Sequence, residues 1–228
     1  MKLTYLKNSG FALEKGEDLI IIDCFNPKAH PMLDAKTLSA KNSITALVSH
    51  SHSDHYSKDI WELPLAKFAV SFDVPKLKEA VALSPGEQAI VNGIELKTYG
   101  STDEGISFHI NWDGLSIFHA GDLNFWHWAD ESTKEYVLEA KAQFLEELSR
   151  IQAGVKALDL AFFPVDKRMG SDYYRGAVMF LEALKPKHFM PMHFGAEFKP
   201  QQQFFDEIST YTKLLFPPPV GKTIELPF

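Results

Sequence analysis

The segment Ser49-His50-Ser51-His52-Ser53-Asp54-His55-Tyr56 places three histidines and an aspartate within six residues. It follows Ile44–Val48, a β-branched apolar run that is typical of a buried strand. His50 and His52 are two residues apart, so in an extended segment their rings point to the same side and can share a metal ion. Asp54 and His55 follow where the chain turns, and they can reach a second, adjacent ion. Imidazole and carboxylate ligands without a thiolate favour zinc, iron or manganese.

The composition narrows the class of protein. The chain has 228 residues and a formal net charge of −7, which argues against nucleic acid or an anionic membrane as a partner. The lone Cys24 excludes an internal disulfide and a Cys-x-x-Cys zinc site. No apolar run approaches the roughly 20 residues of a membrane span, and residues 1–10 lack the pattern of a signal peptide. We therefore expect a cytoplasmic protein that acts on a small molecule; its oligomeric state does not follow from the sequence.

Short strand-like runs dominate both halves of the chain, several of them joined by turn signals such as Asn92-Gly93 and Asp113-Gly114. Strands are predicted at Leu3–Lys7, Phe11–Leu13, Leu19–Asp23, Ile44–Val48, Phe68–Val70, Gln88–Val91, Ile94–Tyr99, Gly105–Trp112, Leu115–His119, Leu158–Val165 and Phe189–Met192. Helices are predicted at Pro75–Leu83, Ser132–Ile151, Ala177–Leu184 and Gln201–Leu215. This order indicates two β–α halves packed sheet to sheet with the helices outside, within a single domain spanning residues 1–228.

The motif His-x-His-x-Asp-His after a strand resembles the signature of the metallo-β-lactamase superfamily, and the rest of the chain matches in order. The similar segments are the opening hairpin Ser9-Gly10-Phe11 with Leu19–Asp23, the strand end Phe118-His119-Ala120-Gly121-Asp122, and the late motif Pro191-Met192-His193-Phe194. The closest branch is that of the uncharacterised metal-dependent hydrolases and the ascorbate-phosphate lactonases. The resemblance implies an α+β fold, an αββα sandwich with metals at one edge.

The resemblance also implies a ligand set. His50 and His52 would hold a first metal ion, Asp54, His55 and His193 a second, and Asp122 would bridge both. The expected cofactor is a divalent metal, with zinc first and manganese or iron as alternatives, as one or two ions.

One position departs from the family pattern. The family places a further histidine of the first metal on a stretch that corresponds to Lys97–Phe108, and here Gly100 stands at that place. The first metal could be weak or absent, which is the interpretation we favour. Asp103 could instead replace the imidazole with a carboxylate, which would favour harder metals. In a third alternative the alignment is shifted, and His109 or His119 serves as the ligand.

The expected reaction is hydrolysis of a small, anionic ester, lactone or phosphoester by metal-activated water. Asp54 and Asp122 are the predicted catalytic carboxylates, with Asp54 beside the metal to orient the attacking water. Further candidates are Trp126 and His127 in the aromatic segment after Asp122 and Lys167 and Arg168 as contacts for an anionic substrate, with Asp166 as a brace for a ligand histidine. The alternative is a catalytically weakened relative that serves as a ligand-binding or sensing module, which the glycine at position 100 motivates.

Overall fold

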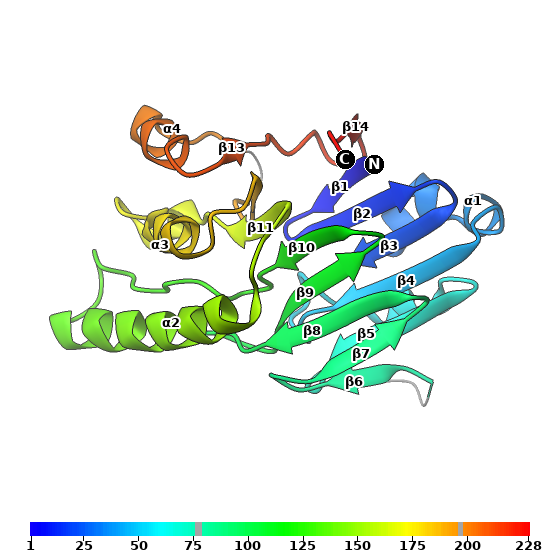
Figure 1. Ribbon diagram of the computed structural model, residues 1–228, viewed down its shortest axis with the longest axis horizontal. Helices are drawn as coiled ribbons and strands as arrows, with labels where there is room; N and C mark the ends of the chain where they lie inside the picture. The colour runs from blue at the N-terminus through cyan, green and yellow to red at the C-terminus, as the bar shows by residue number, and fades with distance from the viewer. Residues whose placement is uncertain (76–78, 196–197) are drawn as a thin grey trace.

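Two seven-stranded sheets face each other in the computed structural model, which describes residues 1–75, 79–195 and 198–228 (Figure 1). The first sheet has the order β14 (Thr223–Glu225), β1 (Lys2–Lys7), β2 (Gly10–Lys15), β3 (Asp18–Ile22), β4 (Ser43–Val48), β5 (Ala66–Ser71) and β6 (Val81–Leu83). The second has the order β13 (Lys213–Leu214), β12 (His188–Met192), β11 (Leu160–Pro164), β10 (Leu115–His119), β9 (Ser107–Trp112), β8 (Ile94–Tyr99) and β7 (Gln88–Val91).

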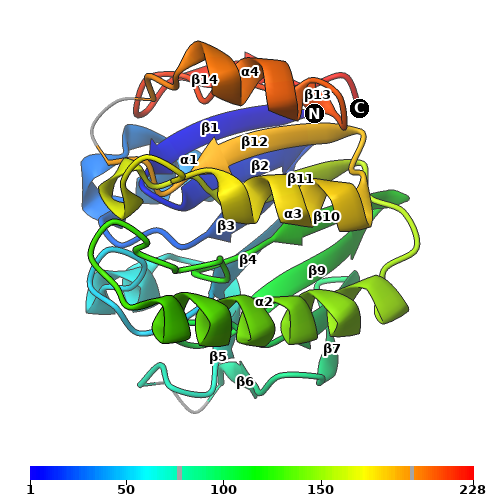
Figure 2. The same ribbon diagram turned by 90° about the vertical axis from the view of Figure 1, so that its left-hand side faces the viewer.

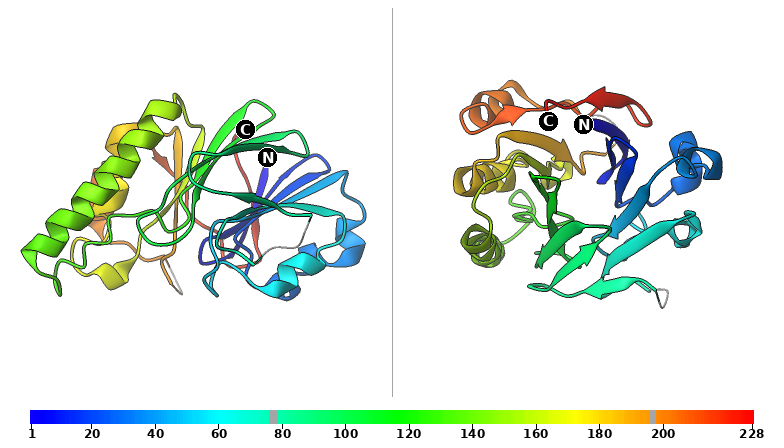
Figure 3. Two further views of the ribbon diagram at one scale, coloured as in Figure 1. Left: turned by 90° about the horizontal axis from the view of Figure 1, so that it is seen from below. Right: turned by 45° about the vertical axis from the view of Figure 1, so that its right-hand side comes forward.

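Helices cover the outer faces of the two sheets. The second sheet is covered by α2 (Lys134–Gly154), α3 (Arg175–Leu184) and α4 (Gln202–Ile208), which lie in front of it in Figure 2. The first sheet packs against α1 (Ala35–Leu38) and short 3₁₀ turns, namely η1 (Pro27–Ala29), η2 (Pro31–Leu33) and η3 (Lys58–Glu62). A fourth 3₁₀ turn, η4 (Lys167–Met169), follows β11 of the second sheet. The left view of Figure 3 shows the resulting layers, helices outside and sheets inside. The predicted α+β class and αββα sandwich are confirmed.

Alternation of side chains along the strands builds two separate apolar layers. In β3, Ile20 and Ile22 point into the cluster between the sheets, whereas Leu19 and Ile21 pack under α1 and the 3₁₀ turns. Strands β4 and β11 are buried along almost their whole length, as their continuous apolar sequences predict. The rings of Phe11 on β2 and Phe162 on β11 meet across the interior with their centroids 4.3 Å apart. The sheets are therefore held together mainly by aromatic and aliphatic packing.

Parallel pairing gathers the functional segments at one edge of the sandwich. Strand β3 pairs in parallel with β4, and β11 pairs in parallel with both β10 and β12. Parallel neighbours bring their carboxyl ends to the same edge of a sheet, so the residues that follow these strands lie together.

Two predicted helices differ from the structure. The helix expected over Gln201–Leu215 ends at Ile208, and Lys213–Leu214 adds a strand to the edge of β12. Ser209-Thr210-Tyr211-Thr212 is a run of weak helix formers, and the free hydrogen-bonding edge of β12 offers partners that a sequence pattern does not reveal. In the segment Pro75–Leu83, residues 76–78 lie outside the described residues, while Val81–Leu83 forms β6 on β5. The apolar residues of Val81–Leu83 belong to an edge strand, so the helix prediction was wrong for these three residues.

No helix in the described parts of the chain is both long enough and apolar enough to cross a membrane.

We expect Phe162→Ala to lower the free energy of unfolding by about 3–5 kcal/mol, because it removes a fully buried ring from the contact between the sheets. Urea unfolding followed by circular dichroism measures the change. Leu138→Ala, at an α2 side chain that is 67% exposed, serves as the control and should change the value by no more than about 0.5 kcal/mol. Equal losses in the two variants would contradict this view of the interior.

Candidate metal centre

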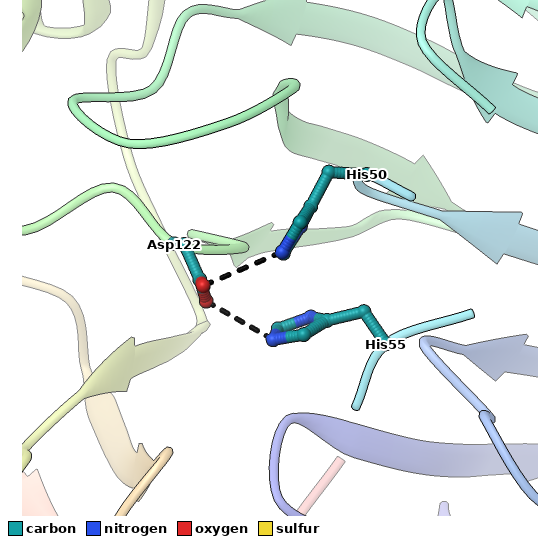
Figure 4. Close-up of side chains that lie close together, drawn as sticks. All are labelled: His50, His55 and Asp122. Carbon is teal, nitrogen blue, oxygen red and sulfur yellow. Dashed lines mark ion pairs between the residues drawn. The ribbon is translucent and has the colours of Figure 1, made fainter. Parts of the chain in front are cut away.

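The carboxyl ends of the strands bring all six predicted ligands into overlapping groups. His50, His55 and Asp122 form one group, Asp54, His55 and His193 a second, and Asp122 joins His52 and Asp103 in a third; within each group the ligand atoms lie within 4.8 Å of one another. Figure 4 shows His50 and His55 pointing toward the two oxygens of Asp122 from one side. Segments that are distant in the sequence thus converge on one carboxylate.

The two oxygens of Asp122 face different partners. Oδ2 lies 3.4 Å from His50 Nε2. Oδ1 lies 3.1 Å from His55 Nε2 and 3.7 Å from His193 Nε2. Asp54 Oδ2 lies 3.7 Å from His193 Nε2 and 3.9 Å from His55 Nε2. This arrangement suits a carboxylate that bridges two neighbouring cation positions.

The residues fit a metal ion by two independent criteria. Donors bound about 2.1 Å from a tetrahedral ion stand ~3.4 Å from one another, which is close to the spacings observed here. His50 Nε2 and Asp122 Oδ1 are also buried without a hydrogen-bond partner in the described part of the chain. An unpaired polar atom in the interior carries a penalty of about 1–3 kcal/mol, which a bound cation would remove.

Asp23 fixes the orientation of two of the histidines, a role that the sequence analysis missed. Its fully buried carboxylate accepts hydrogen bonds from Ser49 N at 2.7 Å and Ser49 Oγ at 2.6 Å, and from His55 Nδ1 at 2.8 Å. Ser49 Oγ in turn lies 3.0 Å from His50 Nδ1 and can accept a hydrogen bond from it. In their neutral form, both rings therefore present an unprotonated Nε2 toward Asp122, as metal binding requires. The only sequence signal for this role was the acidic end of an otherwise apolar strand.

Asp166 braces the third histidine, as the sequence analysis proposed. Its Oδ2 lies 3.0 Å from His193 Nδ1, which again leaves Nε2 of the ring for the centre. The Arg168 guanidinium holds the same carboxylate through Nε and Nη2, at 2.5–3.0 Å. His193 itself has a positive φ of 58° directly after β12, and its N–H donates to Asn8 O. The last ligand candidate is thus fixed by contacts with both sheets.

Asn8 is a second residue that the sequence analysis missed. It lies in the turn between β1 and β2 with a φ of 53°, and its Nδ2 donates to Asp54 Oδ2 at 3.0 Å. Asn tolerates this left-handed conformation better than most residues. The signal in the sequence was an Asn-Ser-Gly turn, which indicates a hairpin and does not reveal a contact 46 residues away.

The comparisons with known proteins show the family to which the chain belongs. A family model described as a beta-lactamase superfamily domain matches residues 2–135, more than half of the chain. The chain belongs to this superfamily. The matched range contains the His-rich motif and Asp122, while His193 lies beyond it. The predicted membership is confirmed, and the resemblance to the ascorbate-phosphate lactonase branch stays a prediction.

Relatives that are similar in sequence cover most of the chain. A UPF0173 metal-dependent hydrolase of Pelotomaculum thermopropionicum is 28% identical over 99% of this chain and 100% of its own. One of Pyrococcus furiosus is 26% identical, over 86% of this chain and 85% of its own. Among solved structures, Igni18, a metallo hydrolase from Ignicoccus hospitalis, covers 100% of this chain and 98% of its own with a TM-score of 0.67 and 20% identity. At that identity the structural likeness concerns the fold.

The superfamily's missing histidine has a structural explanation here. The carboxylate of Glu147 on α2 accepts a hydrogen bond from Gly100 N at 2.6 Å, and a Cβ atom at Gly100 would come within 2.9 Å of its Oε2. The Glu147 carboxylate therefore occupies the space into which a side chain at position 100 would extend. His109 and His119 bond elsewhere, His109 to Ser116 Oγ and His119 to Ser9 O and Gly121 N.

Electrostatics in the centre follow from the crowding of carboxylates and imidazoles. Burial alone would lower the pKa of His55, but the charges of Asp122 and Asp23 outweigh it and raise the pKa to about 10. Burial opposes ionisation of Asp122, yet His55 and His50 hold the pKa of its carboxyl well below the usual range. Partial burial and the negative charge of Asp122 raise the pKa of Asp103. Without a metal ion, protons thus supply the positive charge that the carboxylates require.

A cavity of about 410 Å³ opens beside the centre. Trp126 and Arg168, two of the four predicted substrate contacts, line it together with His52, Asp54, Thr102, Asp103, Asp122, Trp128, Tyr136 and His193. Trp126 Nε1 donates to Asp122 O at 2.7 Å, and the rings of Trp126 and Trp128 stack with centroids 6.1 Å apart.

The other two predicted substrate contacts are not among the residues that line this cavity. His127 is 1% exposed, accepts from Ala129 N at its Nδ1, and has Nε2 3.2 Å from Asp172 O. Lys167 reaches Lys199 O and lies over the Tyr173 ring. Position in the sequence alone could not show which side chains turn toward the cavity.

We expect Asp23→Asn to weaken zinc binding by about 10- to 100-fold, because the amide cannot accept all the hydrogen bonds that orient His50 and His55. Competition with a chromophoric chelator measures the affinity. Asp113→Asn makes the same chemical change at a side chain that is 71% exposed and should leave the affinity unchanged. An unaltered affinity in a folded Asp23→Asn protein would contradict the role assigned to Asp23.

Proposed function

We propose that this protein is a metal-dependent hydrolase of a small ester, lactone or phosphoester that carries an anionic group. One observation carries the proposal: the ligand atoms of Asp54, His55, Asp122 and His193 stand at metal-ligand spacing beside an open cavity. Its relatives bear the name metal-dependent hydrolase, the enzyme class expected from the sequence. A cytoplasmic location and a single domain over residues 1–228 belong to the same proposal.

The proposed cofactor is zinc, with manganese or iron as alternatives. Asp54, His55, Asp122 and His193 would hold one ion, and we name these four residues the second ligand set. When bound, a divalent ion would supply a water of lowered pKa and polarise the carbonyl or phosphoryl oxygen of the substrate. His50 faces the other oxygen of Asp122, Oδ2, and the His52 ring lies beside it, so these two histidines form the beginning of a first ligand set.

The residues of the chain supply orientation and proton transfer. Asp54 is half exposed toward the cavity, while Asn8 anchors its Oδ2, so the carboxylate can accept the proton of an attacking water. That water would add to the electrophilic carbon or phosphorus, the bond to the leaving oxygen would break, and the leaving oxygen would take up the proton. Asp122 would hold the ions in place through both of its oxygens.

One group on the cavity wall, Arg168, offers a contact for an anionic substrate. The Nε and Nη2 groups of Arg168 donate hydrogen bonds to Asp166. Nη1 is not engaged by that carboxylate and can donate to a phosphate or carboxylate group of the substrate. The stacked Trp126 and Trp128 provide an apolar face on which the body of the substrate can lie. The cavity volume of about 410 Å³ fits a small metabolite.

The second candidate function is that of a ligand-binding or sensing module without efficient catalysis. Gly100 motivates it, since the family's histidine is absent. Turnover separates the two candidates, because a binding module would retain metal and ligand without converting a substrate.

We expect chelation to abolish hydrolysis of a panel of lactones, esters and phosphoesters, and zinc or manganese to restore it. His193→Ala should reduce kcat by at least about 10²-fold, because it removes a ligand of the second ligand set. His188→Ala changes the same residue type at the opposite end of β12 and should leave kcat unchanged. Elemental analysis accompanies both assays. Protein that holds metal but turns over nothing in the panel favours the binding module, and protein that holds no metal contradicts the proposal.

Arg168→Gln should raise KM for anionic substrates by about 10- to 100-fold, which corresponds to the loss of one charged hydrogen bond of about 1.5–3 kcal/mol. An uncharged analogue of the same substrate should be affected far less. Lys167→Gln removes the same charge one residue away, outside the cavity lining, and is the matched control. If the charged and uncharged substrates lose affinity equally, Arg168 does not select the anion.

A further inference from the structure

We propose that Asp103 replaces the superfamily's missing histidine and completes the first ligand set as His50, His52, Asp103 and Asp122. This inference rests on the proposed metal-dependent function, and it changes the nature of the first ion site. With it the protein would bind two ions, and the absence of a side chain at Gly100 would not weaken the first site.

The side chains of the first ligand set lie close together around Asp122. Ligand atoms of His52, Asp103 and Asp122 lie within 4.8 Å of one another, and all three residues line the cavity. The ring of His50 lies beside that of His52, with centroids 4.8 Å apart, and His50 Nε2 is 3.4 Å from Asp122 Oδ2. That Nε2 is fully buried and has no hydrogen-bond partner within the described residues, so it lacks the partner that a cation would supply.

The loop that carries Asp103 is fastened on both sides to the metal centre. At one end, Ile106 N donates to Ser49 O at 2.9 Å, and Gly105, with a φ of 72°, lies so close to Ser49 O and His50 that a Cβ atom would overlap with them. At the other end, Thr102 Oγ1 donates to Asn124 O at 2.5 Å and accepts from Asn124 N at 3.0 Å. Asp103 is therefore held between the His-rich motif and the segment that follows Asp122.

The position of the absent histidine is filled by a different group. Glu147 occupies the space next to Gly100 and is itself held by the Gly100 N–H and by Arg150 Nη1 at 2.8 Å. An imidazole could enter there only if the Glu147 carboxylate moved away and gave up these hydrogen bonds. Asp103 lies three residues further along the chain, and its carboxylate is grouped with His52 and Asp122. It can therefore take the place of the absent imidazole as a metal ligand.

Charge supports a cation at this point. Asp103 and Asp122 bring two carboxylates into one group, and only neutral imidazoles accompany them if His50 and His52 are to bind metal. Two like charges at such a distance repel, and a divalent ion between them converts the repulsion into attraction. A set of two imidazoles and two carboxylates is harder than one of three imidazoles and one carboxylate, which favours manganese or iron relative to zinc.

Metal stoichiometry tests this inference without relying on activity. The protein is stripped, reloaded with manganese or zinc, desalted and analysed for metal per chain. We expect wild type to hold two ions and Asp103→Asn to hold about one. Glu104→Gln, the neighbouring acidic residue outside the cavity lining, should hold two. Circular dichroism verifies that each variant is folded.

Asp103→His provides an independent test. It restores an imidazole to the first ligand set, so the variant should again hold two ions, and the ratio of the manganese to the zinc Kd at that site should rise about tenfold or more. In the manganese-loaded wild type, electron paramagnetic resonance should show two exchange-coupled ions, and in Asp103→Asn a single uncoupled ion.

The possible results separate this inference from the proposed function. Two ions in Asp103→Asn would show that another residue completes the site, and a single ion in wild type would show that the first site is vacant; either result overturns the role of Asp103 and leaves a mononuclear or differently ligated hydrolase. No metal in wild type would overturn the proposed function itself.

Discussion

The rest of the centre depends on the hydrogen bonds that the buried carboxylate of Asp23 accepts. Asp23 lies at the end of β3, has a φ of 47°, and holds Ser49 and His55 directly and His50 through Ser49 Oγ. An isolated buried charge would be costly, so the carboxylate is stable only because each neighbour donates to it. Its hydrogen bonds determine which nitrogen of each ring faces the centre, and thereby turn a histidine-rich loop into an oriented set of donors.

The centre joins the two sheets as well as the two ligand sets. Asp23, the His-rich motif and Asn8 come from the first sheet, whereas Asp122, Asp166 and His193 follow strands of the second. Asp122 meets donors of the first sheet through both of its oxygens. The packing of Phe11 on Phe162 fixes the separation of the sheets, so apolar packing sets the distances on which metal chemistry would depend.

Much of the fold and of the centre could be predicted from the sequence, because the deciding signals are local. The strands, the hairpin turns and the His-rich motif depend on neighbours within a few residues, and the late His193 follows a recognisable strand. Other contacts of the centre join residues that are 26 to 47 positions apart. They are the hydrogen bonds of Asp23 with Ser49, of Asn8 with Asp54 and of Glu147 with Gly100. Such contacts depend on how the sheets pack, as does the edge strand β13 where a helix was predicted. For the same reason the sequence analysis favoured a weak or absent first metal, because the contacts that place Asp103 beside His52 and Asp122 are not visible in the sequence.

We expect metal to bind where the segments that follow β4, β10 and β12 converge on Asp122. Anomalous diffraction from crystals of the metal-loaded protein, recorded above and below the absorption edge of the ion, tests it most directly. The expected result is an anomalous peak between Asp122 Oδ1, His55 and His193, accompanied by a second peak on the Oδ2 side of Asp122. The absence of a peak at Asp122 in fully loaded protein, or a peak confined to another part of the molecule, would contradict the claim.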